Sequence, residues 1–378
     1  MIPRRGVKIK FFLSVVIYVV KAAFVPFSAT GGKPAIARAA RLCGLLSKPR
    51  MDRVYAHPNV ARYQLRHTRI GEGVRRPITD GVPLLYQIFF GLARGKSAVQ
   101  SGLQSHHTVG SLPTHAQILT AHVAYYCVTQ DREWLRREGF PLMREAARFW
   151  CDRVTANADG SYSIRNVIGA NEYAVGVTDN AFTNGAARRA LEYASAAAEL
   201  CGERPDPQWS AVAAGLRIPH FADGTTREHA GYDGEMIKQA DANLLGYPLG
   251  IVTGREAQLR DLEYYERRID PRNGPAMSYS VFAIQYARLG MAEKACEMFR
   301  RSYLPNLRPP FGVFAETATS GNPYFMTGAG GMLQAVLFGF GGLEITADGL
   351  VQRPSVLPPQ WKNLRIKING KIYQATNQ

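Results

Sequence analysis

The sequence predicts an all-α fold with a small β element at its C-terminal end. From Thr114 onward, apolar residues recur at spacings of three and four, and Gly, Pro, Asn and Asp residues separate the apolar stretches. No convincing strand lies between successive helices, so we expect antiparallel helical hairpins rather than βαβ units. After Gly341 the pattern changes to short stretches that alternate apolar and polar residues.

The helical part should consist of helices of ordinary length joined by short loops. The expected ranges are 114–129, 133–154, 180–201, 206–214, 237–245, 255–267, 277–289, 291–303 and 328–338. Two longer links, 219–233 and 305–323, are rich in Gly and Pro. Loops of this length commonly carry functional residues, so we expect them to form part of a site.

The β element should contain at least one tight hairpin. Residues 343–346 and 364–368 alternate apolar and polar side chains, and Asn369 with Gly370 forms a two-residue turn signal. So few strands cannot form an independent sandwich. They should therefore pack on the helical body or belong to a truncated β domain.

The chain has 378 residues and a formal charge of +16, and nearly all of this excess positive charge lies in its N-terminal 100 residues. Residues 1–100 hold 18 of the Lys and Arg residues against three acids, whereas residues 101–378 hold 28 against 27. No helix-turn-helix, zinc-finger or aromatic-rich single-strand motif accompanies the basic residues, so nucleic-acid binding is not predicted. The hydrophobic fraction of 46% and charged fraction of 20% fit a folded globular protein.

The cysteine and histidine residues predict neither a disulfide scaffold nor a metal site. The five cysteines are widely separated and include no Cys-x-x-Cys pair. His106, His107, His115 and His122 lie close in the sequence, but no acid or cysteine completes a ligand set.

Residues 1–50 are expected to form a basic and apolar N-terminal extension or a signal-like segment. The apolar stretch 11–20 is shorter than a membrane span and fits the apolar region of a signal peptide better, although Lys21 interrupts it. A signal peptide, an uncleaved anchor that touches a membrane through residues 11–27, and an extension without function all remain open. Cleavage of residues 1–30 would imply a secreted or periplasmic protein; otherwise the protein would be cytoplasmic.

Glu172 is a candidate general acid. It lies in the polar loop 169–173, before a helix whose N-cap could be Thr178 or Asp179. Partial desolvation beside Tyr173 would raise the pKa of such a carboxyl group and suit it to donate a proton. A solvated loop acid is the alternative.

Three further residues have types that suit a sugar site. Lys238 and Gln239 open an apolar helix and could bind sugar hydroxyl groups, or could simply be polar residues of a first helical turn. Glu316 follows an apolar stretch in a loop and would need a hydrogen-bond partner if buried. The Gly-rich stretch 328–331 has neither a preceding strand nor a Lys-Ser/Thr ending, which excludes a P-loop and a dinucleotide fingerprint.

Taken together, these stretches resemble glycoside hydrolase family 65, and more closely its hydrolase branch, the protein-glucosylgalactosylhydroxylysine glucosidases and their bacterial relatives. Residues 169–173 are similar to the Pro-Asp-Glu-Tyr motif of that family, with Ala170 and Asn171 in place of Pro and Asp. Residues 179–184 are similar to its Asn-Asn-x-Tyr-Thr-Asn helix start, and residues 238–241 match its Lys-Gln-Ala-Asp element. Residues 274–278, Glu316 and residues 327–331 follow in the same order.

The resemblance implies an (α/α)₆ toroid over residues 51–340, of which 51–113 match poorly, followed by a β element over 341–378. It implies inverting hydrolysis of an α-glucosyl substrate of the glucosyl-galactose type, with no cofactor. Two residues would be catalytic, and the other residues would bind the sugar. The implied acid and base are Glu172 and Glu316, and the implied sugar-binding residues are Lys238, Gln239, Tyr173 and Asn184.

Two alternatives to hydrolysis stay open. Disaccharide phosphorylases of the same family replace the base with phosphate, but residues 274–278 do not match their Ser-rich phosphate-binding stretch and Glu316 is present, which favours hydrolysis. The large N-terminal β sandwich and the Trp-Asp-Thr-Glu and Trp-Glu-Ser motifs of the family are not found. The chain is therefore expected to be truncated and its toroid incomplete, and a non-catalytic sugar-binding remnant is the second alternative.

Overall fold

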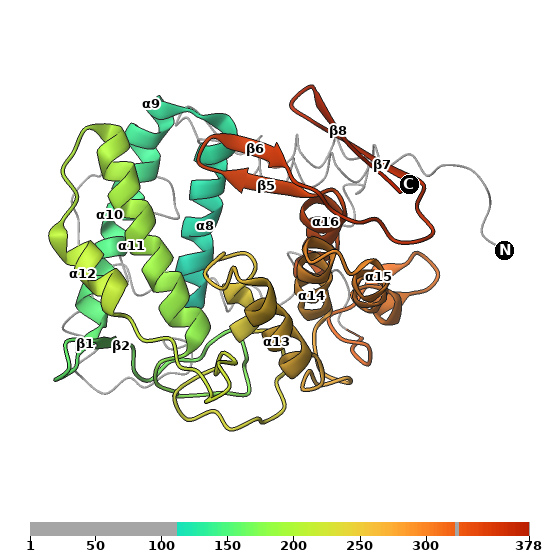
Figure 1. The fold of residues 1–378 in the computed structure, drawn as a ribbon, viewed down its shortest axis with the longest axis horizontal. Coiled ribbons are helices and arrows are strands. Elements are labelled where there is room, and N and C mark those ends of the chain that lie inside the picture. Colours follow the sequence, from blue (N-terminus) through green and yellow to red (C-terminus); the bar gives the residue numbers. More distant parts are fainter. Residues whose placement is uncertain (1–111, 322–324, 378) are drawn as a thin grey trace, which may run out of the picture. The chain divides into compact units, whose positions relative to one another are not determined.

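The computed structural model describes residues 112–321 and 325–377 (Figure 1). The predictions for residues 1–50, including the segment 11–27, and for almost all of 51–113 therefore lie outside the described residues. Among the described helices, none is both long and apolar enough to cross a membrane. The predicted helix-rich fold is confirmed.

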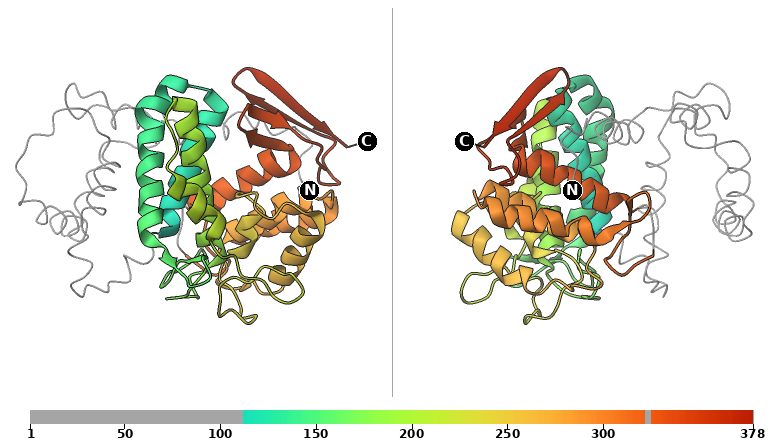
Figure 2. Two further views of the ribbon diagram at one scale, coloured as in Figure 1. Left: turned by 60° about the vertical axis from the view of Figure 1, so that its left-hand side comes forward. Right: turned by 90° about the vertical axis from the view of Figure 1, so that its right-hand side faces the viewer.

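The first group of helices packs around a core formed largely by small residues. α8, α10 and α11 lie side by side in both Figure 1 and Figure 2, and α12 packs on α11. The alanine-rich face of α11 and the ring of Trp150 on α10 are buried. In chain order the elements are α8 (Leu112–Thr129), α9 (Arg132–Trp134), the π-helical turn η1 (Leu135–Gly139), α10 (Phe140–Arg153), α11 (Ala181–Cys201) and α12 (Pro207–Gly215).

The second group of helices surrounds an aromatic core. α14 pairs with α15 as a hairpin and also packs on α16, and Phe282, Tyr286, Phe299 and Phe340 are among the buried residues of this core. The elements are η2 (Ala242–Leu245), α13 (Arg255–Glu266), α14 (Ala276–Arg288), α15 (Ala292–Arg301), η3 (Leu304–Asn306), α16 (Met326–Gln334) and η4 (Ala335–Phe340).

The predicted β element is present and packs on this aromatic core. β5 (Leu343–Thr346) pairs with β6 (Gly349–Gln352), and β7 (Asn363–Ile368) pairs with β8 (Lys371–Thr376), both antiparallel. The predicted Asn369–Gly370 turn is confirmed, because both residues have positive φ angles, 49° and 84°, as a type I′ hairpin requires. Leu364, Ile366 and Tyr373 from this hairpin are buried in the core.

Two short strand pairs lie between the helices, where no strand was predicted. β1 (Thr155–Ala156) pairs with β2 (Tyr162–Ser163), and β3 (Leu307–Arg308) pairs with β4 (Val313–Phe314). Each strand has only two residues, which is too few for a period-2 pattern to be visible in the sequence.

The prediction of a helix over residues 237–245 is wrong for its first half. Residues 237–241 are irregular, and only the 3₁₀ turn η2 follows them. The backbone N–H of Ile237 donates to Arg268 O at 2.8 Å, and that of Ala240 donates to Ser278 Oγ at 3.0 Å. Because these groups bond to distant segments, they are not available for helical i to i−4 bonds.

The N-cap of α11 is also corrected. Asn180, rather than Thr178 or Asp179, caps the helix, since its side-chain oxygen accepts from the Thr183 N–H at 2.8 Å. Asp179 has a φ angle of 54°, and its buried carboxylate accepts from the Ile164 N–H at 3.2 Å. Its side chain therefore does not cap the helix but bonds to the preceding loop.

Candidate active site

Asp241 joins the two loops that carry most of the predicted site residues. Its Oδ2 accepts from the backbone N–H groups of Ala170 at 2.6 Å and Asn171 at 3.1 Å, and its Oδ1 accepts from Asn180 Nδ2 at 2.9 Å. The loop passes so close that a Cβ atom on Gly169 would lie 2.3 Å from Asp241 Oδ2. Only glycine fits at this position without displacing the carboxylate.

Asn171 provides a second connection between the same loops. Its Oδ1 accepts from the N–H groups of Tyr173 at 3.2 Å and Lys238 at 2.9 Å, and its Nδ2 donates to Glu228 Oε1 at 2.9 Å. The residues just before Glu172 are therefore tied to the loop that carries Lys238, and the residue after it is tied back to Asn171.

Lys238 lies within electrostatic reach of both predicted catalytic carboxyl groups. Its Nζ forms an ion pair with Glu172 Oε2. Burial lowers the pKa of Lys238, but the hydrogen bond and charge of Glu172, together with the charge of Glu316, outweigh it and raise the pKa above the ordinary value. The lysine side chain is 21% exposed and that of Glu172 is 57% exposed, so the pair lies at the protein surface. The structure therefore brings Glu172, Lys238 and Glu316 into one neighbourhood.

Gln239 supports the loop of Glu172 through its side-chain amide. It is buried, and its Oε1 accepts from the Glu172 N–H at 3.4 Å. The loop of Lys238 and Gln239 thus contacts Glu172 both through the lysine ammonium group and through the glutamine amide.

Glu316 is held by its backbone. Its carbonyl oxygen accepts from Asn306 Nδ2 at 3.0 Å and from the N–H of Ala276, the first residue of α14, at 3.2 Å. Asn306 also donates to the carbonyl of Ala315. These bonds anchor the long loop after α15 beside the start of α14, with the Glu316 side chain half-buried.

Tyr173 is fixed at its hydroxyl end. It donates to Asp270 Oδ2 at 2.8 Å, while the residue as a whole is 48% exposed. Asp270 also accepts from the N–H groups of Asn273 and Arg272, and these bonds lower the pKa of Asp270 to about 2. An ionised Asp270 therefore anchors an aromatic ring whose remaining surface is available at the site.

Asn184 lies inside the protein, unlike the exposed Glu172 and Tyr173. It is fully buried, and its Nδ2 donates to Asp179 Oδ1 at 3.1 Å and to the Arg217 carbonyl at 2.7 Å. This placement does not support the predicted contact between Asn184 and substrate.

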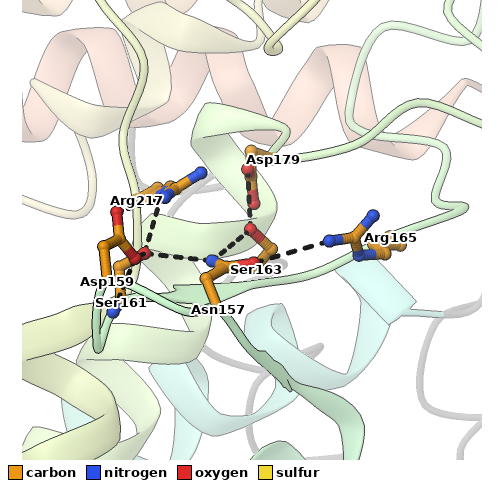
Figure 3. A network of polar contacts seen from close by, with 7 residues as sticks. All are labelled: Asn157, Asp159, Ser161, Ser163, Arg165, Asp179 and Arg217. Atoms are coloured by element: carbon orange, nitrogen blue, oxygen red, sulfur yellow. Dashed lines mark hydrogen bonds and ion pairs between the residues drawn. The ribbon is translucent and has the colours of Figure 1, made fainter.

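Asp179 connects Asn184 to a polar network that reaches the surface, drawn in Figure 3. Its Oδ2 accepts from Ser163 Oγ at 3.0 Å. The network continues through residues of the β1–β2 turn to the guanidinium group of Arg217, which pairs with Asp159. Figure 3 labels Asn157, Asp159, Ser161, Ser163, Arg165, Asp179 and Arg217.

Sequence reasoning assigned no role to Asn171, Glu228 or Asp241. Glu228 and Asp241 are buried beneath the Glu172 loop, and burial raises the pKa of both carboxyl groups. The negative charge of Asp241 raises the pKa of Glu228 further. The three hydrogen bonds that Asp241 accepts favour its charged form, whereas burial and the charge of Asp241 favour the neutral form of Glu228.

Glycoside hydrolases commonly use a pair of carboxyl groups on either side of the scissile bond. Residues 92–232 match the family model of the glycosyl hydrolase family 65 central catalytic domain. The predicted resemblance to glycosyl hydrolase family 65 is therefore confirmed.

Two curated relatives are similar to this chain in sequence. A kojibiose hydrolase of Mucilaginibacter mallensis is 47% identical over 266 residues, which are 70% of this chain and 38% of the relative. A protein-glucosylgalactosylhydroxylysine glucosidase of Danio rerio is 38% identical over 263 residues, which are 68% of this chain and 39% of the relative. The chain thus spans less than two fifths of the length of these relatives.

A solved structure shares the fold. A putative kojibiose phosphorylase from the human microbiome superposes with a TM-score of 0.54 at 18% sequence identity. The superposition covers 69% of this chain and 44% of that chain. At this identity the likeness describes the fold alone.

Proposed function

We propose that this chain carries the site of an inverting glycoside hydrolase that releases glucose from an α-glucosyl substrate. The names of the two relatives point to kojibiose or a glucosylgalactosyl group as the substrate class. The observation that carries the proposal is that the ammonium group of Lys238 forms an ion pair with Glu172 and also interacts electrostatically with Glu316.

In this proposal Glu172 is the general acid and Glu316 the general base. Glu172 donates its proton to the glycosidic oxygen as the bond to the anomeric carbon breaks. Glu316 takes a proton from a water molecule that attacks the opposite face of the sugar, so the anomeric configuration inverts. An inverting pair needs about 6.5–9.5 Å between its carboxyl groups to leave room for that water. Solvent then restores both protonation states.

The remaining residues would bind and position the sugar. Lys238 can donate to a sugar hydroxyl, and the half-exposed ring of Tyr173 offers an apolar surface to a sugar face. Gln239 and Asn184 are buried, so we propose that they position the loops around the substrate instead of forming its main contacts.

We also infer that the described hairpins belong to an (α/α)₆ toroid. The catalytic domain would span residues 51–340 and the β element residues 341–378. Support comes from paired helices such as α14 and α15 and from the likeness in fold to a solved structure.

Phosphorolysis is the second candidate, because the solved structure of similar fold is named a phosphorylase. The deciding experiment incubates the full chain with kojibiose in the presence and absence of inorganic phosphate. Glucose release that does not require phosphate supports hydrolysis. Formation of glucose 1-phosphate, only when phosphate is present, would establish a phosphorylase, and sugar binding without any product would establish a non-catalytic protein.

A further inference from the structure

Two buried polar side chains contact each other beneath Glu172. Asn171 is 2% exposed and Glu228 is 0% exposed, and they meet through the bond from Asn171 Nδ2 to Glu228 Oε1 at 2.9 Å. The backbone of Glu228 is fixed as well, since its carbonyl accepts from the Ala181 N–H at 2.7 Å and from Asn180 Nδ2 at 3.2 Å. The backbone of Glu228 is therefore anchored to the start of α11.

The hydrogen bond between Asn171 and Glu228 determines the orientation of the Asn171 side-chain amide. A carboxamide has one accepting oxygen and one donating nitrogen. The oxygen lies between two donors, the N–H groups of Tyr173 and Lys238. If the amide were turned over, its NH₂ group would face these two donors, and its oxygen would face Glu228. The acceptor on Glu228 therefore favours the one orientation in which all these groups are paired.

We propose that Glu228 is a positioning residue of the active site: by accepting from the Asn171 amide, it aligns the backbone segments that present Glu172 and Lys238 to the substrate. The inference rests on the proposed function for its catalytic meaning. Glu228 does not touch the substrate in this account. It acts through Asn171, which is adjacent to Glu172 in the chain and bonded to the N–H of Lys238.

Other titratable groups face Glu228 and decide its ionisation. Asp241 and Glu235 carry charges of the same sign, and Tyr232 and Tyr265 are within electrostatic range. Burial and these charges favour a neutral carboxyl group. Its Oε2 has no hydrogen-bond partner among the described residues. The proton can therefore reside on Oε2 while Oε1 accepts from Asn171.

The first test compares two replacements of Glu228 of similar size in the full chain. Glu228→Gln keeps an oxygen acceptor for Asn171, whereas Glu228→Leu removes it and leaves the buried amide unpaired. We expect Glu228→Leu to lower kcat/KM for kojibiose by about tenfold to a hundredfold, the effect of an unsatisfied buried group. Glu228→Gln should lose much less. Equal losses in the two variants would overturn the proposal.

The second test uses Asn171→Asp, because Glu228→Leu could also impair folding. The introduced carboxyl group and that of Glu228 would have to share one proton to remain in contact, as two adjacent carboxyl groups do. We expect the ratio of its kcat/KM to that of the wild type to fall as the pH rises from about 7 to about 10, because burial and the charge of Asp241 raise the pKa of Glu228 and the shared proton is lost only in alkaline solution. In Asn171→Asp combined with Glu228→Gln, the glutamine NH₂ can donate to the introduced carboxylate at every pH. This double variant should therefore lose the pH-dependent defect.

Unfolding by urea separates this inference from the proposed function. If the wild-type chain released no glucose, the hydrolase proposal would fail, but the four proteins of this cycle could still be compared by their free energies of unfolding. At about pH 10, where the shared proton of Asn171→Asp is lost, the double variant should be more stable than Asn171→Asp alone. A double variant that keeps the pH-dependent defect of Asn171→Asp, in stability or in activity, would contradict the pairing of Asn171 with Glu228.

Discussion

Lys238 and Glu172, which are 66 residues apart in the chain, form an ion pair between two irregular loops. Because the glutamate is largely exposed, such a pair contributes little to stability. Its importance lies in position, since the same ammonium group also interacts with Glu316. The lysine thereby links the two carboxyl groups to which the proposed mechanism assigns opposite roles.

Replacing either carboxyl group with its amide should abolish most of the activity. Glu172→Gln and Glu316→Gln keep the shape of the side chain but cannot transfer a proton, so each should lower kcat by about 10²–10⁴-fold. The two losses should differ with the leaving group. A substrate such as a glucosyl fluoride, whose leaving group needs no protonation, should partly rescue Glu172→Gln and not Glu316→Gln. The same response in both variants would contradict the assigned roles.

Lys238→Met should lower kcat/KM for kojibiose by about tenfold to a hundredfold, because hydrogen bonds to a charged group contribute about 1.5–3 kcal/mol. The free energy of urea unfolding should change little. Lys367→Met, on the exposed face of β7, is the matched control and should leave both quantities near the wild-type values. An unchanged kcat/KM in Lys238→Met would contradict the proposed role of Lys238 in binding the substrate.

Gly169→Ala should destabilise the protein by about 1–3 kcal/mol, because the added methyl group would lie 2.3 Å from both Asp241 Oδ2 and Asn180 Nδ2. Gly330→Ala in α16 is the control. A Cβ there meets nothing within 4 Å, and alanine favours the helix, so its unfolding free energy should stay equal or rise by up to about 1 kcal/mol. Urea unfolding of both variants checks this contrast, and equal stabilities would contradict the close packing around Gly169.

Asp270 should contribute a pH-dependent part of the stability. Backbone N–H groups, foremost that of Asn273, lower its folded-state pKa from 3.8 to about 2. A lowered pKa stabilises the fold above the unfolded pKa, and this contribution is lost as the pH falls from 3.8 towards 2. The unfolding free energy of Asp270→Asn should therefore fall less steeply over this range than that of the wild type. Asp348→Asn, in an exposed turn, should follow the wild type, and parallel curves for all three proteins would contradict the role of Asp270.

Local signals in the sequence predicted the elements that local interactions stabilise. The 21-residue helix α11 follows from its alanine-rich apolar face, and the Asn369–Gly370 turn follows from two residues that tolerate positive φ angles. The irregular backbone of residues 237–241 could not be predicted in this way, because its N–H groups bond to Arg268, Asn171 and Ser278. The apolar pattern of this segment indicated a helix, because the sequence does not reveal these distant partners.

The sequence likewise predicted only some residues of the candidate site. Glu172, Lys238 and Glu316 were predicted from residue type and motif order, and in the structure Lys238 pairs with Glu172 and interacts electrostatically with Glu316. Glu228 carried no sequence signal, since its partner Asn171 is 57 residues away. Asn184 was expected to contact the substrate, but its amide donates hydrogen bonds to Asp179 and to the Arg217 carbonyl inside the protein. Residue type indicates what a side chain can do, whereas tertiary contacts decide which partner it meets.

The anomeric form of the first product tests the central claim, that Glu172 and Glu316 act as an inverting acid and base. The full chain is mixed with kojibiose, and proton NMR spectra are recorded before the released glucose equilibrates between its two anomers. Direct attack by water on an α-glucosyl bond predicts that β-glucose appears first and that its formation does not depend on phosphate. The initial appearance of α-glucose, or the absence of any glucose release, would contradict the account.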